Sequence, residues 1–233
     1  MTAVKSIWQG VYASFDDAKV QNDELTRDSS FRSQRWFNNS LETFTKLRNA
    51  VAEPDFIHTF EILEQDPLPL ATAMVMGQKP TVRILDFGGG IGCSAVPLLG
   101  HIPDNSSVEI VIVDNSEICE FGNELFSDEP RVSFSDELPQ ESEHFDIIHC
   151  RSSLQYVDDW LDILGKLGRY HADYILICDL PAGDIPTIVT LQIYYEFLIP
   201  VHFWNIHEFI AAMENLDYSL KLKAGYTATI RGV

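Results

Sequence analysis

Residues 84–92 read Ile-Leu-Asp-Phe-Gly-Gly-Gly-Ile-Gly, an apolar run followed directly by a cluster of glycines. This pattern is typical of a buried strand that ends in a tight turn, and residues 92–100 then favour a helix. Glycine lacks a Cβ, so the turn can adopt positive φ and its backbone can lie close to a ligand. The start of the next helix offers unpaired N–H groups and a partial positive charge. A nucleotide-like cofactor is the expected occupant of such a turn.

The segment after residue 79 alternates short apolar runs with amphipathic stretches. The apolar runs are rich in Ile and Val, as expected for strands buried on both faces of a sheet. Alternating strands and helices indicate a parallel sheet with right-handed crossovers. The sequence therefore predicts an α/β, Rossmann-like, doubly wound core over residues 79–233. We predict its strands at 82–87, 108–113, 131–134, 145–149 and 174–179, and its helices at 92–100, 117–126 and 159–170.

The flanking segments predict a helical cap and a terminal hairpin. In residues 1–78, Ser14–Asp17 resembles a capping box, and apolar side chains recur at helical spacing from Phe37 to Val51. That pattern continues through 56–63, and a short helix is expected at 70–76. Near the other end, a helix at 207–216 precedes two further strands, which would pair as an antiparallel hairpin and complete a mostly parallel, seven-stranded sheet. These two strands are expected at Tyr218–Lys223 and Tyr226–Arg231.

Charge and cysteine usage narrow the range of partners. The chain has 16 Lys and Arg against 35 Asp and Glu, a formal net charge of −19, so nucleic acid and anionic lipid are unfavourable partners. The four cysteines form no C-x-x-C pair and have no histidine at metal-like spacing, so we expect free thiols, no metal site and a reducing, cytoplasmic location. No signal peptide is evident at the N-terminus, and the apolar residues 185–204 are interrupted by polar side chains, so no membrane span is expected.

In an open α/β sheet, ligands bind outside the carboxyl ends of the strands, so the residues that follow each strand are the candidate site. Asp114, 26 residues after Gly88, can accept hydrogen bonds from two ribose hydroxyls, and Ser135 with Asp136 is placed to meet an adenine edge. The alternatives are a plain turn for the glycines and a helix cap for Asp114. The predicted cofactor-binding residues are Asp86, Gly88, Gly89, Gly90, Gly92, Asp114, Asn115, Ser135, Asp136, Cys150, Arg151 and Ser152.

The form of the glycine cluster favours S-adenosylmethionine (SAM) over a dinucleotide. A dinucleotide-binding turn normally reads G-x-G-x-x-G and lies near the N-terminus. Here position 93 is Cys, and an acidic residue, Asp86, precedes the glycines. A nicotinamide-dependent oxidoreductase is therefore the weaker alternative.

The acidic-x-Gly-x-Gly-x-Gly pattern resembles the first motif of the class I SAM-dependent methyltransferases. Four further pieces make the chain similar, over nearly its whole length, to one family within that class. The members of that family are often encoded in bacterial surface-polysaccharide gene clusters, and their methyl acceptor is unassigned. The family commonly has Glu where this chain has Asp114, and Arg or Thr near Cys178-Asp179. The four pieces are Trp8–Phe15, Ser153–Tyr156, Thr190–Gln192 and Asn205-x-x-Glu208-Phe209.

The resemblance implies a SAM-binding core and methyl transfer, and we expect residues 181–206 to form an insertion on the acceptor side. The segment follows the fifth strand and is longer than an ordinary strand–helix loop. Its Gln, Tyr, His and Asn side chains suit a small-molecule or carbohydrate-like acceptor, with the segment around Trp8 and Tyr12 closing over it. The candidate catalytic bases are His202 and Asp179, with His149 as a third; a structural histidine is the alternative for His202. The segment could instead pack on the core or form a homodimer interface, and the chain could bind SAM without transferring methyl groups.

Overall fold

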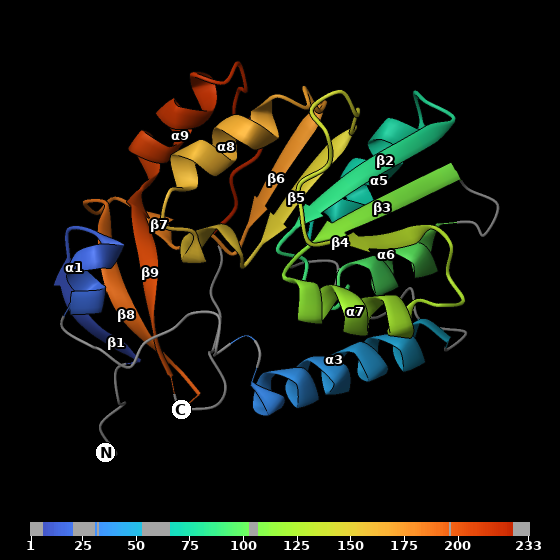
Figure 1. Cartoon of the computed structure of the whole chain (residues 1–233). Helices are drawn as coiled ribbons and strands as arrows, with labels where there is room; N and C mark the ends of the chain where they lie inside the picture. The colour runs from blue at the N-terminus through green and yellow to red at the C-terminus, as the bar shows by residue number, and fades with distance from the viewer. Residues whose placement is uncertain are drawn as a thin grey trace. The chain divides into compact units, whose positions relative to one another are not determined.

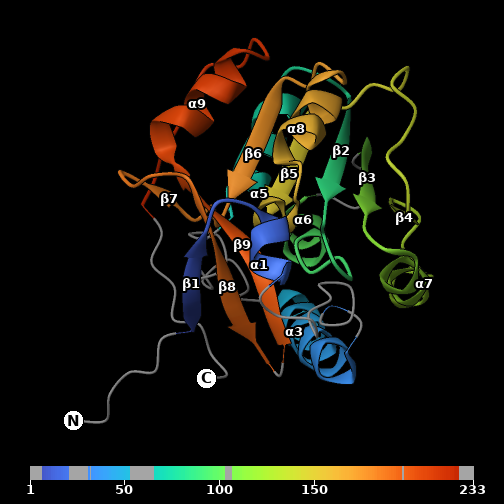
Figure 2. The same cartoon turned by 60° about the vertical axis from the view of Figure 1, so that its left-hand side comes forward.

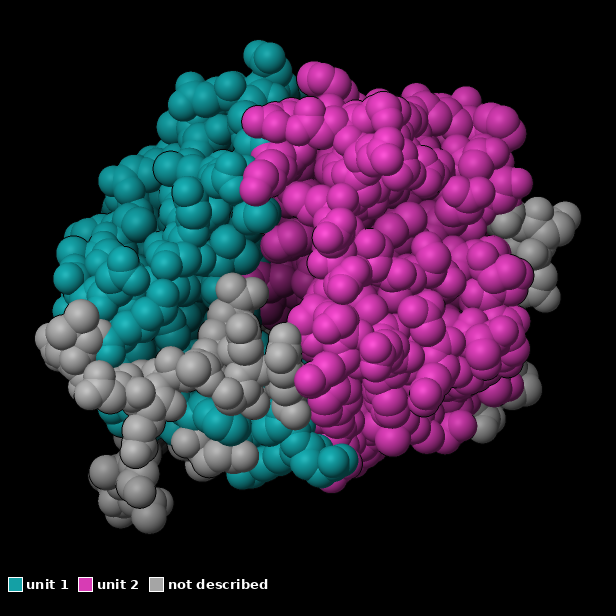
Figure 3. All heavy atoms as spheres, viewed as in Figure 1, with its two compact units in different colours: residues 1–36, 154–165, 179–233 teal, residues 37–153, 166–178 magenta. Residues whose placement is uncertain are grey.

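The computed structural model describes residues 7–20, 31, 33–52, 66–102, 107–195 and 197–225. By its internal contacts the chain divides into two compact units, coloured separately in Figure 3. The first unit consists of residues 1–36, 154–165 and 179–233, and the second of residues 37–153 and 166–178. The predicted boundary between residues 78 and 79 falls inside the second unit.

The second unit contains a five-stranded parallel sheet in the order β4-β3-β2-β5-β6 (Figure 1). All five predicted strands are confirmed, within one or two residues at most ends. The buried side chains of these strands are mostly Ile, Val and Leu. β2 lies at the centre of the sheet, between β3 and β5. The predicted count of seven strands is wrong for the sheet of the described residues, which has five. The strands are β2 (Thr81–Phe87), β3 (Ser107–Val113), β4 (Val132–Ser135), β5 (Ile147–Arg151) and β6 (Tyr174–Cys178).

Helices α3 (Gln34–Ala52), α5 (Leu68–Met76), α6 (Ala95–His101) and α7 (Ser116–Leu125) pack in this unit. Helix α6 begins three residues later than predicted, because residues 90–94 form turns that complete the glycine loop. The apolar periodicity of α3 is confirmed: Phe37 meets Phe121 and Phe44 meets Phe126, with ring centroids 5.4 and 5.3 Å apart. The expected continuation through 56–63 lies outside the described residues.

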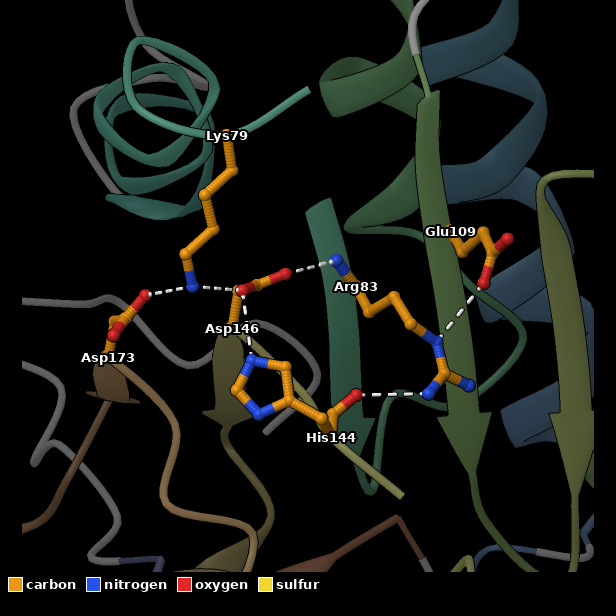
Figure 4. Close-up of polar contacts among 6 residues, drawn as sticks. All are labelled: Lys79, Arg83, Glu109, His144, Asp146 and Asp173. Carbon is orange, nitrogen blue, oxygen red and sulfur yellow. Dashed lines mark hydrogen bonds and ion pairs between the residues drawn. The ribbon is translucent and has the colours of Figure 1, made fainter. Parts of the chain in front are cut away.

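A cluster of charged residues joins β2, β3, β5 and β6 at the end of the sheet opposite the glycine loop (Figure 4). The buried Asp146 carboxylate accepts hydrogen bonds from Lys79 Nζ at 2.5 Å, from the Arg83 N–H at 2.8 Å and from His144 Nε2 at 3.2 Å. Lys79 also reaches Asp173, at 2.6 Å. Burial alone would raise the pKa of Asp146, but these donors lower it below its usual value. Asp146 therefore fixes the start of β5 against β2.

The first unit contains a four-stranded sheet in the order β1-β8-β9-β7, seen from a second direction in Figure 2. Strand β1 (Trp8–Tyr12) pairs antiparallel with β8 (Ile188–Tyr194), and β8 forms an antiparallel hairpin with β9 (Phe197–Asn205). Strand β7 (Ala182–Gly183) completes the sheet. The N-terminal segment around Trp8 and the 181–206 segment are thus parts of one sheet.

The predicted C-terminal hairpin is wrong in its described part. Residues 218–223 form no strand, and Leu220 and Leu222 are exposed, so this segment has no buried face that would hold it in a sheet. Its expected partner, residues 226–231, lies outside the described residues. Among the described residues, an antiparallel hairpin is formed instead by β8 and β9, both of which bury apolar side chains.

Three helices accompany this sheet in sequence: α1 (Phe15–Val20), α8 (Trp160–Gly168) and α9 (Ile206–Glu214). The predicted helix start at Ser14 is confirmed, because Ser14 Oγ accepts the N–H of Asp17 at 3.1 Å. Phe15 and Ala18 of α1 pack on Val189 and Leu191. The fully buried Trp204 lies against Trp160 and Phe209, which joins β9 to α8 and α9 in one apolar cluster.

Candidate cofactor site

The loop after β2 has the backbone conformation that its glycines predict. Gly88, Gly90 and Gly92 have φ of +67°, +59° and +88°, values that side-chain-bearing residues rarely adopt. The loop is also tightly enclosed. A Cβ on Gly88 would lie 2.4 Å from Ser153 Cβ, and one on Gly89 would lie 2.5 Å from Asp86 Oδ2. The glycines are therefore required both by the turn and by the packing beneath it.

Asp114 lies at the end of β3 and holds the glycine loop. Its Oδ2 accepts the N–H of Gly90 at 2.9 Å, while Oδ1 accepts the N–H of Asn115 at 2.8 Å. The helix cap proposed as the alternative for Asp114 belongs to its neighbour, since Asn115 Oδ1 accepts the N–H of Ile118 at 3.1 Å and begins α7. Asp114 Oδ1 also accepts a hydrogen bond from Asn115 Nδ2 at 3.3 Å, and the side chain is half-buried.

Beneath the loop lies a chain of buried charges that begins at Asp86. Asp86 Oδ1 accepts a hydrogen bond from His149 Nδ1 at 2.9 Å. On the other side of the ring, His149 Nε2 lies 3.3 Å from Asp66 Oδ1. Asp66 Oδ2 in turn pairs with Arg151 Nη1 at 3.1 Å. The side chains of Asp86, His149 and Asp66 are 2%, 0% and 5% exposed, so no solvent screens these charges from one another.

The two carboxylates change the protonation of the histidine between them. Burial alone would lower the pKa of His149, but Asp86 and Asp66, with a contribution from Cys178, raise it well above the usual value. Burial would likewise raise the pKa of Asp66, but His149, Arg151 and the N–H of Leu68 lower it to about 2. The two carboxylates therefore favour the protonated form of the His149 ring. The His149 ring is fully buried and both of its nitrogens face carboxylates, so it offers no open nitrogen to an acceptor and is the weakest of the three candidate bases.

The remaining predicted cofactor residues differ in how accessible they are. Ser135 is the partly buried last residue of β4, and the exposed Asp136 follows it. Ser135 Oγ donates to the Glu137 carbonyl at 2.7 Å. Ser152, exposed after β5, has a positive φ of 50°. Cys150 is 1% exposed inside the sheet, and burial raises the pKa of its thiol to about 12. A direct contact from the Cys150 side chain to a ligand is therefore excluded, and Arg151 is the accessible side chain at the end of β5.

Two residues of this site were missed by the sequence analysis. Asp66 accepts the N–H of Leu68 at 3.0 Å and so supports the start of α5, besides its role beside His149. The signal was present, because an acidic residue before Pro67 and an apolar helix is a common start pattern. Ser153 lies against Gly88, and its buried Oγ has no hydrogen-bond partner among the described residues. No local sequence pattern predicts the contact between Ser153 and Gly88.

The predicted acceptor-side residues lie in the first unit. His202 is 8% exposed, stacks on Phe15 with ring centroids 4.6 Å apart, and places Nε2 3.1 Å from the Asp158 carbonyl. Tyr156 donates to Gln192 Oε1 at 3.0 Å, and the buried Gln192 lies on β8. Asn205 caps α9 by accepting the N–H groups of His207 and Glu208.

Asp179, directly after β6, is partly buried and has a positive φ of 56°. Aspartate adopts this left-handed conformation more readily than most residues, although still at a cost. Ser152 after β5 has the same conformation. Two adjacent strands therefore end in residues with strained backbones, a feature that recurs at binding sites.

In the described part of the chain, no helix combines the length and apolarity that crossing a bilayer needs.

The comparisons with known proteins give one family. Residues 66–221 match the family model described as "Methyltransferase domain". No curated protein matches the chain.

Among solved structures, the YcgJ protein from Bacillus subtilis is 19% identical, with a TM-score of 0.46, over 65% of this chain and 68% of that one. The N-terminal domain of EvdMO1 with SAH bound is 18% identical, with a TM-score of 0.45, over 65% and 71%. The CurJ carbon methyltransferase is 20% identical, with a TM-score of 0.38, over 43% and 30%, so this chain spans less than a third of that protein.

Proposed function

The chain belongs to the methyltransferase domain family, whose model covers its residues 66–221, and we propose that it transfers a methyl group from SAM to a small-molecule or carbohydrate-like acceptor. The observation that carries the proposal is the loop after β2. Three glycines adopt positive φ in the loop at the end of the central strand, and Asp114 holds one of them from the end of the next strand. This is the position at which an open α/β sheet binds a nucleotide-like ligand.

The donor set fits SAM. Gly88, Gly89 and Gly90 would lie against the cofactor, while the buried Gly92 packs against Phe126 and closes the turn. Asp114 would accept hydrogen bonds from the ribose hydroxyls of the cofactor. Ser135 and Asp136 would meet the adenine, while Asn115, Arg151 and Ser152 complete the edge of the site. Asp86 would act from beneath the loop, and Cys150 only through its backbone.

When bound, SAM supplies an electrophilic methyl group on a sulfonium. The residues of the chain then have to hold the acceptor in line with that methyl group and exclude water. Orientation of this kind can contribute roughly 7–11 kcal/mol to lowering the barrier. A base is needed only if the acceptor atom carries a proton that must leave.

His202 is proposed as that base, with Asp179 as the second candidate. The Asp158 carbonyl can only accept, so Nε2 of His202 carries the proton and Nδ1 keeps its lone pair. Nδ1 is buried and has no hydrogen-bond partner among the described residues. Burial lowers the pKa of His202, although the Asp158 carbonyl opposes this, so the ring is neutral and able to accept a proton at neutral pH. A purely structural role, through its stacking on Phe15, is the competing account.

The acceptor side is proposed to be built by the β1-β8-β9-β7 sheet. Residue 179 follows β6 directly, so the chain leaves the carboxyl end of the parallel sheet as it enters this segment. Tyr156, Gln192 and Tyr194 offer ring faces and hydrogen bonds of the kind that a sugar ring uses. An acceptor in surface-polysaccharide synthesis, within a cytoplasm that keeps the four cysteines reduced, is the proposed setting.

Calorimetry tests the cofactor. SAM and S-adenosylhomocysteine (SAH) are expected to bind with micromolar affinity, about −8 kcal/mol, whereas NAD is expected to give no heat. NAD binding without any SAM or SAH heat would instead favour the oxidoreductase alternative. SAM binding without methyl transfer to any sugar-nucleotide or small-molecule panel would favour the non-catalytic alternative.

Replacing Asp114 with alanine is expected to weaken SAH binding by about 1.5–3 kcal/mol, because hydrogen bonds to a charged acceptor are lost. Part of this loss comes from Gly90, whose N–H would lose its acceptor. Asp114→Asn keeps one acceptor oxygen and should fall between alanine and wild type. A folded Asp114→Ala protein with wild-type SAH affinity would contradict the ribose role of Asp114.

A further inference from the structure

The chain of charges below the glycine loop connects three separate elements. Asp86 lies on β2, His149 on β5, and Asp66 directly before α5. The Asp86 carboxylate presses against the loop, since a Cβ on Gly89 would come within 2.5 Å of its Oδ2. Any group that holds the Asp86 side chain in place therefore also holds the surface against which Gly89 packs.

His149 is the residue that holds the Asp86 side chain in place. The ring nitrogen Nδ1 holds Asp86 at 2.9 Å, and the opposite edge of the ring meets Asp66 at 3.3 Å. Asp66 is itself held by Arg151 and by the N–H of Leu68. With the ring fully buried, the two carboxylates have no water to replace it, so a change in His149 leaves Asp86 uncompensated.

A metal ion is the other occupant that this cluster could suggest. The ligand atoms of Asp66, His149 and Cys178 lie within 4.8 Å of one another, and all three residues are buried. However, Asp66 already pairs with Arg151, and a cation beside Arg151 would be repelled. The two carboxylates are balanced by one imidazolium and one guanidinium, so the cluster needs no further positive charge.

We propose that His149 is a positioning residue for the cofactor: its buried ring holds Asp86 beneath Gly89 and, through Asp66, ties the glycine loop to Arg151 and to the start of α5. The inference rests on the proposed function, because the loop is taken to hold SAM. It assigns no chemistry to His149, whose fully buried ring presents no surface to a substrate or cofactor. Its role is to keep the loop in the binding conformation before the ligand arrives, so that no binding energy is used to order it.

The pH dependence of cofactor binding gives this role a signature. The titratable groups that face the ring are Asp86 from β2, Asp66 before α5, Cys178 from β6 and the neighbouring Cys150 of β5. Loss of the His149 proton in alkaline solution would leave Asp86 and Asp66 facing a neutral ring. SAH affinity should therefore fall as pH rises through the elevated pKa of His149, and this fall should be absent once the pair is made neutral.

The experiment is a double-mutant cycle read by SAH calorimetry, with His149→Gln, Asp86→Asn and the double variant. His149→Gln should weaken SAH binding about tenfold or more, since it orphans a buried carboxylate. The double variant should recover most of that loss, because an amide pair can replace the ion pair, and its SAH affinity should not fall in alkaline solution. His144→Gln is the matched control, because this exposed histidine lies at the opposite end of the sheet and should leave SAH affinity unchanged.

The outcomes separate a failure of the proposed function from a failure of the proposed role of His149. A wild-type protein that does not bind SAH removes the proposed function and this role with it. A wild-type protein that binds SAH, with a folded His149→Gln variant of equal affinity, overturns the role of His149 alone. If His149→Gln does not fold, the double variant and the wild-type pH profile decide, and a pH-independent wild type counts against the proposal. A stoichiometric metal ion in purified wild-type protein would also overturn it.

Discussion

The Gly88→Val protein is expected to bind no detectable SAM or SAH and to unfold at a markedly lower temperature than wild type. Gly88 has a φ of +67°, and holding a β-branched residue there costs about 1–3 kcal/mol. The new Cβ would also lie 2.4 Å from Ser153 Cβ, and overpacking of this kind costs a further 1–3 kcal/mol or so. To relieve the backbone strain and the clash, the loop must move away from Ser153. The backbone surface proposed to hold the cofactor is then lost.

Two further variants test these two causes, the backbone strain at Gly88 and the steric clash with Ser153. Gly165→Ala in α8 adds a Cβ that meets nothing within 4 Å, so it should keep SAH affinity and gain about 0.5–1 kcal/mol of stability. Gly88→Ala combined with Ser153→Gly removes the steric clash but keeps the strained φ, and should recover part of the stability lost in Gly88→Ala. Retained SAH binding in Gly88→Val would show that the loop is only a turn.

Asp146→Asn is expected to cause a loss of about 1.5–3 kcal/mol in the free energy of unfolding, measured by denaturant titration. The side chain is 5% exposed and accepts hydrogen bonds from Lys79, Arg83 and His144, so the substitution removes the charge on which three donors converge. Asp173→Asn is the matched control. That carboxylate is 47% exposed and shares the same lysine, and a surface ion pair of this kind contributes less than about 1 kcal/mol.

The same carboxylate predicts how stability changes with acid. The folded-state pKa of Asp146 is lowered, so its contribution is present above the pKa of the unfolded chain and is lost as pH falls through the folded value. Asp66, whose pKa is lowered to about 2, acts in the same direction. Wild type should therefore lose stability in acid more steeply than Asp146→Asn. Parallel stability curves for the two proteins would contradict this account of Asp146.

The sequence predicted the parallel sheet well because its signal is local. Runs of Ile and Val bounded by Gly, Asp and Ser mark each strand, and the rule that ligands bind at carboxyl ends then selects the glycine loop and Asp114. The cluster around His149 could not be predicted, because Asp66 lies 83 residues before it and only the fold brings them together. The terminal hairpin was misplaced for a related reason, because β-type residues occur in both 188–205 and 218–223. Within the described part of the chain, the first segment pairs with a further strand, β1, and the second forms no strand.

The pairing of β1 with β8 has a consequence for how the chain is made. Thr190 Oγ donates to the carbonyl of Gly10, a contact across 180 residues. On a ribosome that adds about 5–20 residues per second, β1 therefore waits roughly 10–40 seconds before its partner strand emerges. During that interval its backbone N–H and C=O groups are open to other chains, the usual hazard of an unpaired edge. Gly10, with a φ of +72° beside the irregular register between Gln9 and Tyr12, bends this strand away from the flat geometry that intermolecular pairing needs. Replacing Gly10 with a β-branched residue would thus lower the yield of newly synthesised protein as well as the stability of the finished molecule, in which the new Cβ would lie 2.5 Å from the Tyr12 hydroxyl.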